Sequence, residues 1–138
     1  MCGIAGYIGQ KKYFPEKNNI NNCLKAMQLR RGPDSVGQKT VHNENYSFAF
    51  LHSRLSIIDP NPRSNQPMED EEGILSFSGE IYNYLELKSI CESKGAKFKT
   101  TSDTEVLLKM LNIFGTKAFK ILDGDWAFSY YNKKKIPL

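Results

Sequence analysis

Cys2 is the residue of this chain whose type and position could do the most chemistry. Removal of Met1 would leave a thiol and a free α-amine on one residue. An unperturbed α-amine titrates near ~7.7–8.0 and a thiol near ~8.5, so close to neutral pH the amine can accept the thiol proton. N-terminal nucleophiles carry their base in this way. Gly3 would let the backbone approach a substrate closely.

Two charged side chains further along could bind a substrate that carries both charges. Arg54 can hold a carboxylate with two parallel hydrogen bonds, a geometry that lysine cannot reproduce. Asp103 could pair with an ammonium group, although the helix dipole also stabilises a carboxylate at the start of a predicted helix. His42 and His52 are candidate acid–base residues. Neither pairs in sequence with a nucleophile, so we expect both to be structural.

Composition and charge fit one folded domain over residues 1–138. The chain is 40% hydrophobic and 25% charged, as ordinary globular domains are. Its net charge of +4 is scattered, whereas a nucleic-acid surface shows a basic stripe with interleaved aromatics. No run approaches the ~20 apolar residues of a membrane helix, and no secretory signal opens the chain. We therefore expect a cytoplasmic protein without nucleic-acid or membrane partners.

The three cysteines, Cys2, Cys23 and Cys91, stand at wide and unrelated spacings. They form no C-x-x-C motif and no cysteine–histidine ligand set, so both a disulfide framework and a zinc site are disfavoured. Cys23 and Cys91 fall on the apolar faces of predicted helices, where small core thiols are common. We expect no metal site.

The first half of the chain predicts strands on either side of a helix. Residues 3–9 form a short apolar run typical of a strand, and residues 20–27 carry apolar side chains at helical spacing. Gly32-Pro33 ends that helix, because proline cannot continue it. Residues 36–55 alternate as a β-hairpin does. Residues 59–73 are rich in turn-forming and acidic residues, which predicts a long exposed loop.

The second half predicts a strand followed by two helices. Residues 74–77 indicate the strand, 84–91 the first helix and 102–114 the second. The second helix begins at a capping box, in which the Ser102 side chain caps the helix and Glu105 reaches back to the backbone of the cap.

Residues 126–131 indicate a last, aromatic strand. No hairpin partner follows it in the sequence, and an unpaired apolar strand at an edge is a liability. We therefore expect a fragment of a longer protein. The order of elements indicates the α+β class, with layers of sheet and helix.

Several segments together resemble the class II glutamine amidotransferases, and among them the asparagine synthetases. They are Met1-Cys2-Gly3-Ile4-Ala5-Gly6, Arg31-Gly32-Pro33-Asp34 with Gly37, His52-Ser53-Arg54-Leu55-Ser56-Ile57-Ile58-Asp59 and Ser78-Gly79-Glu80-Ile81-Tyr82-Asn83. Ser102-Asp103-Thr104-Glu105 and Leu122-Asp123-Gly124-Asp125-Trp126-Ala127-Phe128 add two supporting matches. The matches follow the family's order along nearly the whole chain. The sugar-phosphate and phosphoribosyl amidotransferases share the opening segment but resemble the middle ones less well.

The resemblance implies the fold of the N-terminal-nucleophile hydrolases, a four-layer αββα sandwich, here incomplete at its C-terminus. It also implies the glutaminase half of an asparagine-synthetase-like enzyme. The Cys2 thiolate would attack the side-chain amide of glutamine, ammonia would leave, and water would hydrolyse the thioester to glutamate. The ammonia would amidate aspartate in an ATP-dependent C-terminal domain that we expect outside these 138 residues.

The resemblance also assigns the site residues. In the family, the oxyanion lies against the Gly79 N–H with residue 78 beside it. Arg54 binds the substrate α-carboxylate, and Glu80 with Asp103 binds the α-ammonium. Backbone that lines the pocket comes from Leu55, Ser56, Ile57 and Ile58.

Two positions depart from the family pattern. Asparagine is commonest where this chain has Ser78, and many members have histidine where it has Arg30. A serine hydroxyl can donate a hydrogen bond, but it is shorter than an amide and can rotate away. The sequence therefore predicts a partly filled oxyanion hole at Ser78 and no consequence at Arg30.

The resemblance implies L-glutamine as the substrate and a synthetase domain or subunit as the receiver of ammonia. It implies no cofactor in this domain, since ATP and Mg would bind only in the synthetase domain, and it leaves a homodimer open. Two alternatives remain. One is an amidotransferase that supplies a sugar or antibiotic precursor, and the other is a non-catalytic fragment or interaction module with the same fold.

Overall fold

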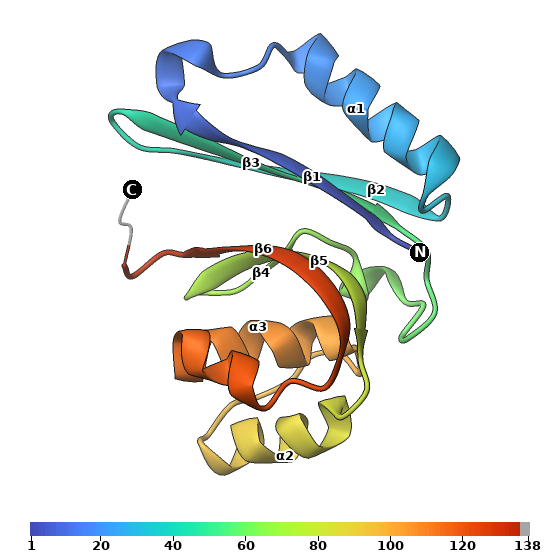
Figure 1. Cartoon of the computed structure of the whole chain (residues 1–138), viewed down its shortest axis with the longest axis vertical. Helices are drawn as coiled ribbons and strands as arrows, with labels where there is room; N and C mark the ends of the chain where they lie inside the picture. The colour runs from blue at the N-terminus through green and yellow to red at the C-terminus, as the bar shows by residue number, and fades with distance from the viewer. Residues whose placement is uncertain (136–138) are drawn as a thin grey trace.

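The computed structural model describes residues 1–135, and the last three residues of the predicted 1–138 domain lie outside the described part. Two three-stranded antiparallel sheets face each other, with α1 on one outer face and α3 and α2 on the other (Figure 1). The layers therefore run helix, sheet, sheet, helix. This arrangement confirms the α+β class and the αββα sandwich predicted from the sequence.

The first sheet has the strand order β1-β3-β2. Its strands are β1 (Gly3–Gln10), β2 (Ser35–His42) and β3 (Tyr46–Arg54). Successive side chains of the central strand point to opposite faces. Leu51 packs against the apolar face of α1 (Lys17–Arg30), while Phe48 and Phe50 pack towards the second sheet. The predicted first strand, helix and hairpin are confirmed.

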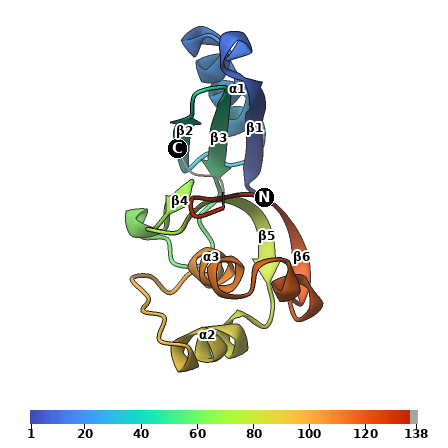
Figure 2. The same cartoon turned by 90° about the vertical axis from the view of Figure 1, so that its left-hand side faces the viewer.

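The second sheet has the strand order β4-β5-β6. Its strands are β4 (Met68–Glu69), β5 (Gly73–Ile81) and β6 (Gly124–Asn132). β6 pairs with β5 along its whole length, from Gly124↔Ile81 to Asn132↔Gly73. β6 is an edge strand, as the sequence predicts, but it is not left without any partner, because it pairs with an upstream strand beyond two helices. Figure 2 shows β1 and β6 on the same side of the sandwich.

Helices α2 (Tyr84–Ser93) and α3 (Asp103–Phe114) cover the outer face of the second sheet. Short 3-10 turns span Lys11–Tyr13, Pro62–Ser64 and Gly115–Lys120. The main core lies between β5 and α3 and contains Leu75, Phe77, Leu107 and Met110. No helix within residues 1–135 is long and apolar enough to cross a membrane.

The prediction of a long exposed loop over residues 59–73 was wrong in part. The segment contains a helical turn and β4, and it buries Ser64, Gln66 and Met68. Gln66 turns inward because it satisfies a backbone group elsewhere: its Oε1 accepts a hydrogen bond from Phe77 N at 2.7 Å. Composition predicts exposure only when polar groups have no internal partners.

The predicted capping box is half right. Ser102 Oγ accepts a hydrogen bond from Glu105 N at 3.3 Å, so the serine caps α3 as predicted. The buried Glu105 carboxylate does not take the cap N–H. It accepts from Lys99 N at 3.0 Å, Thr100 N at 2.7 Å and Thr100 Oγ1 at 2.6 Å. Glu105 therefore anchors the segment before α3.

Candidate active site

A cavity of about 470 Å³ opens where β1 begins, at the end of the sandwich where the chain starts. Both sheets and the start of α3 contribute to its walls. The predicted site residues that line it are Cys2, Arg54, Leu55, Ile57, Ile58, Ser78, Gly79, Glu80 and Asp103. Ser56 is not among the lining residues. The structure therefore brings all but one of the predicted residues together from segments far apart in the sequence.

Cys2 is half-buried at the floor of this cavity. Its Sγ lies 3.4 Å from Leu55 N and 3.6 Å from Leu55 O. Its carbonyl oxygen accepts hydrogen bonds from Ser78 Oγ at 2.9 Å and from Arg31 Nε at 3.4 Å. The strand pairing of β1 begins at the next residue, Gly3. The thiol thus lies against Leu55, directly after β3, while Ser78 of β5 holds the carbonyl of the same residue.

Beyond the two-residue β4, the edge of β5 that faces away from β6 presents backbone N–H groups to the cavity wall. Phe77 N–H donates to Gln66 Oε1 at 2.7 Å, and Ile81 N–H donates to Asp103 Oδ2 at 3.2 Å. Alternate residues of an extended strand direct their N–H groups to the same edge. The Gly79 N–H therefore points out between these two bonds and into the cavity.

Gly79 is a position that only glycine fits. Its φ is +146°, and a Cβ there would collide with the carbonyl oxygen of Asp125 on β6. The neighbouring Ser78 directs its hydroxyl proton to Cys2 O, not into the cavity. A hydroxyl has a single proton to donate. The Ser78 hydroxyl thus holds the backbone of Cys2, and Gly79 is the glycine beside it in the cavity lining.

Arg54 is 4% exposed, and its guanidinium donates hydrogen bonds to the loop that follows β3. Nη1 donates to Asn61 O at 3.2 Å and to Asn65 Oδ1 at 2.9 Å. Nη2 donates to Ile58 O at 3.3 Å and to Asp59 O at 2.6 Å. The four Nη protons are thus used, and Nε–H is the remaining donor of the five on the side chain. A two-pronged grip on a carboxylate would need one of these loop bonds to be exchanged.

The acidic side of the cavity is formed by Asp103, Glu80 and Asp125. Asp103 is 5% exposed, and its burial raises its pKa, with the charge of Glu80 acting in the same direction. An ammonium group bound between the two would favour the ionised carboxylate again. At the rim, Tyr82 Oη donates to Asp125 Oδ2 at 2.9 Å, and this bond raises the pKa of Tyr82.

Sequence reasoning missed several lining residues, among them Gln66, Thr104 and the β6 residues Asp125, Trp126 and Ala127. The β6 residues lie in a segment that resembles the family, but strand pairing was needed to place them in the wall. Gln66 lies in the segment predicted to be an exposed loop. No local pattern marks a buried amide of this kind.

Arg31 of the Arg31-Gly32-Pro33-Asp34 segment lines the cavity, and the residues that follow it hold the end of β3. Asp34 N donates to Arg54 O at 3.0 Å, and Asp34 Oδ2 accepts from Ser56 N at 2.7 Å. Gly32 is buried against the backbone of Ser53 and Arg54, where a side chain would collide. Ser56 is therefore held by Asp34, outside the cavity lining, and the segment fixes the end of β3.

Neither histidine lines the cavity, which agrees with their predicted structural roles. His52 is fully buried, and its Nε2 lies 3.0 Å from Phe77 O. Burial lowers the pKa of His52 to about 4. Its ring is therefore neutral near pH 7, with the Nε2 proton donated to the Phe77 carbonyl. His42 Nδ1 lies 2.6 Å from Ser47 Oγ on the neighbouring strand.

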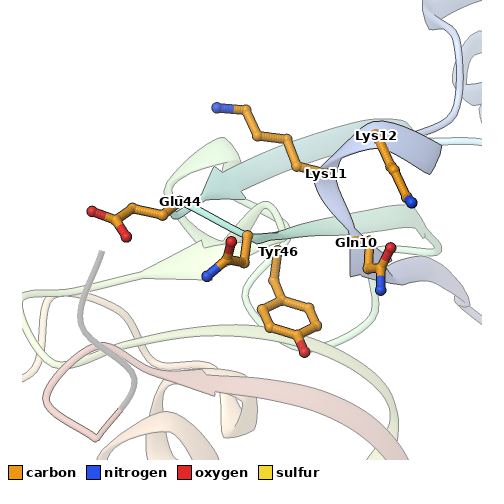
Figure 3. Close-up of a pocket in the computed structure, with 6 residues that line it drawn as sticks. Gln10, Lys11, Lys12, Glu44 and Tyr46 are labelled. Atoms are coloured by element: carbon orange, nitrogen blue, oxygen red, sulfur yellow. The ribbon is translucent and has the colours of Figure 1, made fainter.

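A second hollow of about 630 Å³ lies at the opposite end of β1, between Lys11–Tyr13 and the β2–β3 turn (Figure 3). All six lining residues are exposed, and the labelled side chains spread outwards. It has no buried polar group that could orient a ligand. Within residues 1–135, no group of three or more His, Cys, Asp or Glu residues could hold a metal ion.

The decisive comparison is with protein families. The glutamine amidotransferase domain family matches residues 1–138. The chain belongs to this family. This finding agrees with the resemblance of the sequence segments. It also agrees with the cavity, which has Cys2 in its lining and charged groups on both sides.

Two curated relatives resemble this amidotransferase domain over nearly its whole length. A putative glutamine-hydrolysing asparagine synthetase 2 of Methanocaldococcus jannaschii is 38% identical over 98% of this chain. The glutamine-hydrolysing asparagine synthetase 1 of Bacillus subtilis is 39% identical over 96% of it. The chain spans only 28% and 21% of the lengths of these relatives. The domain thus corresponds to their glutaminase portion.

Solved structures confirm the fold. The glutamine phosphoribosylpyrophosphate amidotransferase from B. subtilis, solved with ADP and GMP, matches with a TM-score of 0.70 and 19% identity. The match covers 94% of this chain and 35% of that one. The stacked sheets thus have the same fold as that amidotransferase, in agreement with the predicted fold.

Proposed function

We propose that this amidotransferase domain hydrolyses L-glutamine to glutamate and ammonia through a thioester on Cys2. The observation that supports the proposal is one cavity lined by the Cys2 thiol, the Gly79 N–H, the Arg54 guanidinium and the Asp103 carboxylate. Glutamine carries an amide at one end and a zwitterion at the other. The cavity offers a nucleophile and an oxyanion donor for the first, and groups of both charges for the second.

These groups support the following reaction. After Met1 is removed, the neutral Cys2 amine takes the thiol proton, and the sulfur attacks the amide carbon. The carbonyl oxygen becomes an oxyanion facing the Gly79 N–H. The C–N bond then breaks, and the ammonium on Cys2 returns a proton to the departing ammonia. Water, deprotonated by the same amine, cleaves the thioester to glutamate.

For the whole protein we propose that the ammonia amidates aspartate in a synthetase domain or subunit. The two asparagine synthetase relatives support this choice over a sugar or antibiotic precursor. ATP and Mg would be bound outside residues 1–138, and this domain itself would need no cofactor. A cytoplasmic location and a homodimer remain proposals of the same kind.

The nucleophile is tested by Cys2→Ala in the full-length protein. Glutamate release should fall below detection, while the free energy of unfolding should change little, because position 2 precedes β1. Mass spectrometry of the parent should show that Met1 is removed. The matched control is Cys23→Ala on α1, outside the cavity, which should keep the parent rate. Undiminished glutamate release by Cys2→Ala would refute the mechanism.

The acceptor needs a separate experiment. The full-length protein is given glutamine labelled with ¹⁵N in the side-chain amide, together with aspartate and ATP. We expect the label in the amide of asparagine. Glutamate formation with the label remaining in free ammonia would refute aspartate as the acceptor and leave the glutaminase proposal intact.

A further inference from the structure

The loop from Leu55 to Gln66 carries one wall of the cavity, and Asp59 stands at its centre. Asp59 has a φ of +48°, a left-handed conformation that aspartate tolerates better than most residues. Its backbone oxygen accepts a hydrogen bond from Arg54 Nη2 at 2.6 Å. The unusual backbone angle therefore brings the carbonyl of Asp59 onto the arginine that faces the substrate.

The side chain of Asp59 points the other way, to the segment that precedes α3. Oδ2 accepts hydrogen bonds from Thr101 N at 2.8 Å and from Arg63 Nε at 3.1 Å, and Arg63 Nη2 lies 3.1 Å away. The Asp59 side chain is 4% exposed. The Thr101 N–H, followed by Arg63, holds the pKa of Asp59 well below its usual range. The carboxylate is thus a charged anchor under the surface.

Asp59 connects the two charged sides of the cavity. Its carbonyl holds Arg54 at the end of β3, in the first sheet. Its carboxylate holds Thr101, two residues before Asp103, and Asp103 begins the helix that covers the second sheet. Ser102 between them is fixed as the N-cap of that helix. A short path of hydrogen bonds and two peptide units therefore joins Arg54 to Asp103.

We propose that Asp59 is a positioning residue that sets the separation between Arg54 and Asp103, and thereby selects a substrate with both an α-carboxylate and an α-ammonium group. This inference rests on the proposed function, because it concerns the glutamine pocket of that function. Asp59 itself does not line the cavity and touches no substrate. It acts by keeping two side chains, one at the end of the first sheet and one at the start of the helix over the second sheet, in register with one zwitterion.

The nucleophile does not depend on this connection. Cys2 Sγ is held by the backbone of Leu55, and the adjoining Ser56 is tied independently by Asp34. Gly79 is fixed by its pairing with β6. Loosening Asp59 should therefore weaken glutamine binding and leave the chemistry at Cys2 nearly unchanged.

Two substitutions remove the anchor while respecting its backbone angle. Asp59→Asn keeps the shape and one acceptor oxygen, and asparagine tolerates a left-handed φ. Asp59→Gly removes the whole side chain, and glycine adopts this φ without strain. Each is made in the full-length protein and, for calorimetry, in a Cys2→Ala background, so that glutamine binds without being consumed.

We expect the Kd of L-glutamine to rise at least about tenfold, the equivalent of ~1.4 kcal/mol. The Kd of glutaramate, which has the carboxylate but no ammonium group, should change by less than about twofold. In the variants with Cys2, kcat at saturating glutamine and the rate at which iodoacetamide alkylates the thiol should each stay within about twofold of the parent. Those three readouts separate positioning from a general loss of structure.

Asp70→Asn is the matched control. The Asp70 carboxylate also accepts two backbone N–H groups, those of Glu72 and Gly73 at 2.9 Å, and it pairs with Lys109 at 2.7 Å. Despite its burial, the hydrogen bond from Lys109 lowers the pKa of Asp70. It lies at the β4–β5 turn, not in the cavity. Asp70→Asn should lower the free energy of unfolding and leave both Kd values unchanged.

Three results would overturn the inference: an unchanged glutamine Kd in the Asp59 variants, equal losses for glutamine and glutaramate, or an equal loss in Asp70→Asn. The proposed function fails in a different way, through hydrolysis that survives Cys2→Ala. The binding comparison does not use hydrolysis, so it decides the role of Asp59 in either case.

Discussion

The hydroxyl of Ser78 donates its only proton within the protein, in the absence of any substrate. The proton goes to the carbonyl of Cys2, at an Oγ–O distance of 2.9 Å, so the residue next to Gly79 holds the backbone of Cys2. The sequence alone predicted a partly filled oxyanion hole at this position. The structure adds a second role that the residue type could not indicate, because the carbonyl it meets lies 76 positions away in the chain.

Substitutions at position 78 should therefore act on catalysis more than on binding. Ser78→Ala frees the Cys2 carbonyl, and we expect kcat to fall about tenfold, in line with the ~1.5 kcal/mol that a hydrogen bond can contribute. The KM for glutamine should change little, because an attack geometry matters mostly in the transition state. Steady-state kinetics of glutamate release measure both.

Ser78→Thr is the control, since it keeps the hydroxyl and suits a strand. It should retain kcat within a few-fold. A full rate in Ser78→Ala would show that Arg31, 3.4 Å from the same carbonyl, holds Cys2 without help.

At the scale of elements, several buried hydrogen bonds converge on the start of α3. Ser102 caps the helix, and the buried Glu105 carboxylate accepts hydrogen bonds from the backbone N–H groups of residues 99–100. We expect Ser102→Ala to lower the free energy of unfolding by about 1 kcal/mol. Glu105→Gln should lower it by about 2–3 kcal/mol, because an amide N–H₂ would face backbone donors in a buried place. Urea unfolding of both variants measures the difference.

The reverse order, with the cap costing more than Glu105, would mean that Glu105 is replaced easily by water. The variants also differ in their expected effect on the site. Glu105 holds the segment that contains Thr101 and so the partner of Asp59. Glu105→Gln should therefore weaken glutamine binding more than Ser102→Ala does.

Elements whose signals are local were predictable from sequence. Periodicity predicted β1, α1, the β2–β3 hairpin, α2 and α3, and the ordered segments predicted which residues would meet in the cavity. Two kinds of feature were not predictable. The pairing of β6 with β5 is set by a contact across two helices, and the inward turn of Gln66 depends on an unpaired N–H of β5. Both features depend on contacts between residues far apart in the sequence, and a short stretch of sequence does not contain both partners.

At the scale of the whole molecule, His52 links the two sheets through Phe77 O. Its pKa falls from 6.5 to about 4 because of burial. The unfolded chain therefore binds more protons between pH 6.5 and 4, and stability must rise with pH across this window. The stability that the buried, neutral His52 contributes is fully present above pH 6.5 and is lost as the pH falls towards 4. The shift corresponds to about 3 kcal/mol as an upper bound.

His52→Gln should test this, since the amide can donate to Phe77 O but does not titrate. We expect the urea midpoint of the parent to fall steeply between pH 6.5 and 4, and that of the variant to fall less. Parallel curves would show that other groups control the acid limb.

The exposed position of Met1 affects where a purification tag can be placed. Met1 is 75% exposed at the mouth of the cavity, and the strand ladder begins only at Gly3↔Ser53. Extra residues fused ahead of Met1 would run into solvent and break no ladder hydrogen bond. They would, however, keep the nitrogen of Cys2 inside an amide bond. A purification tag at this end should give a protein that folds and melts normally yet releases no glutamate, and cleavage that leaves Cys2 as the first residue should restore the activity.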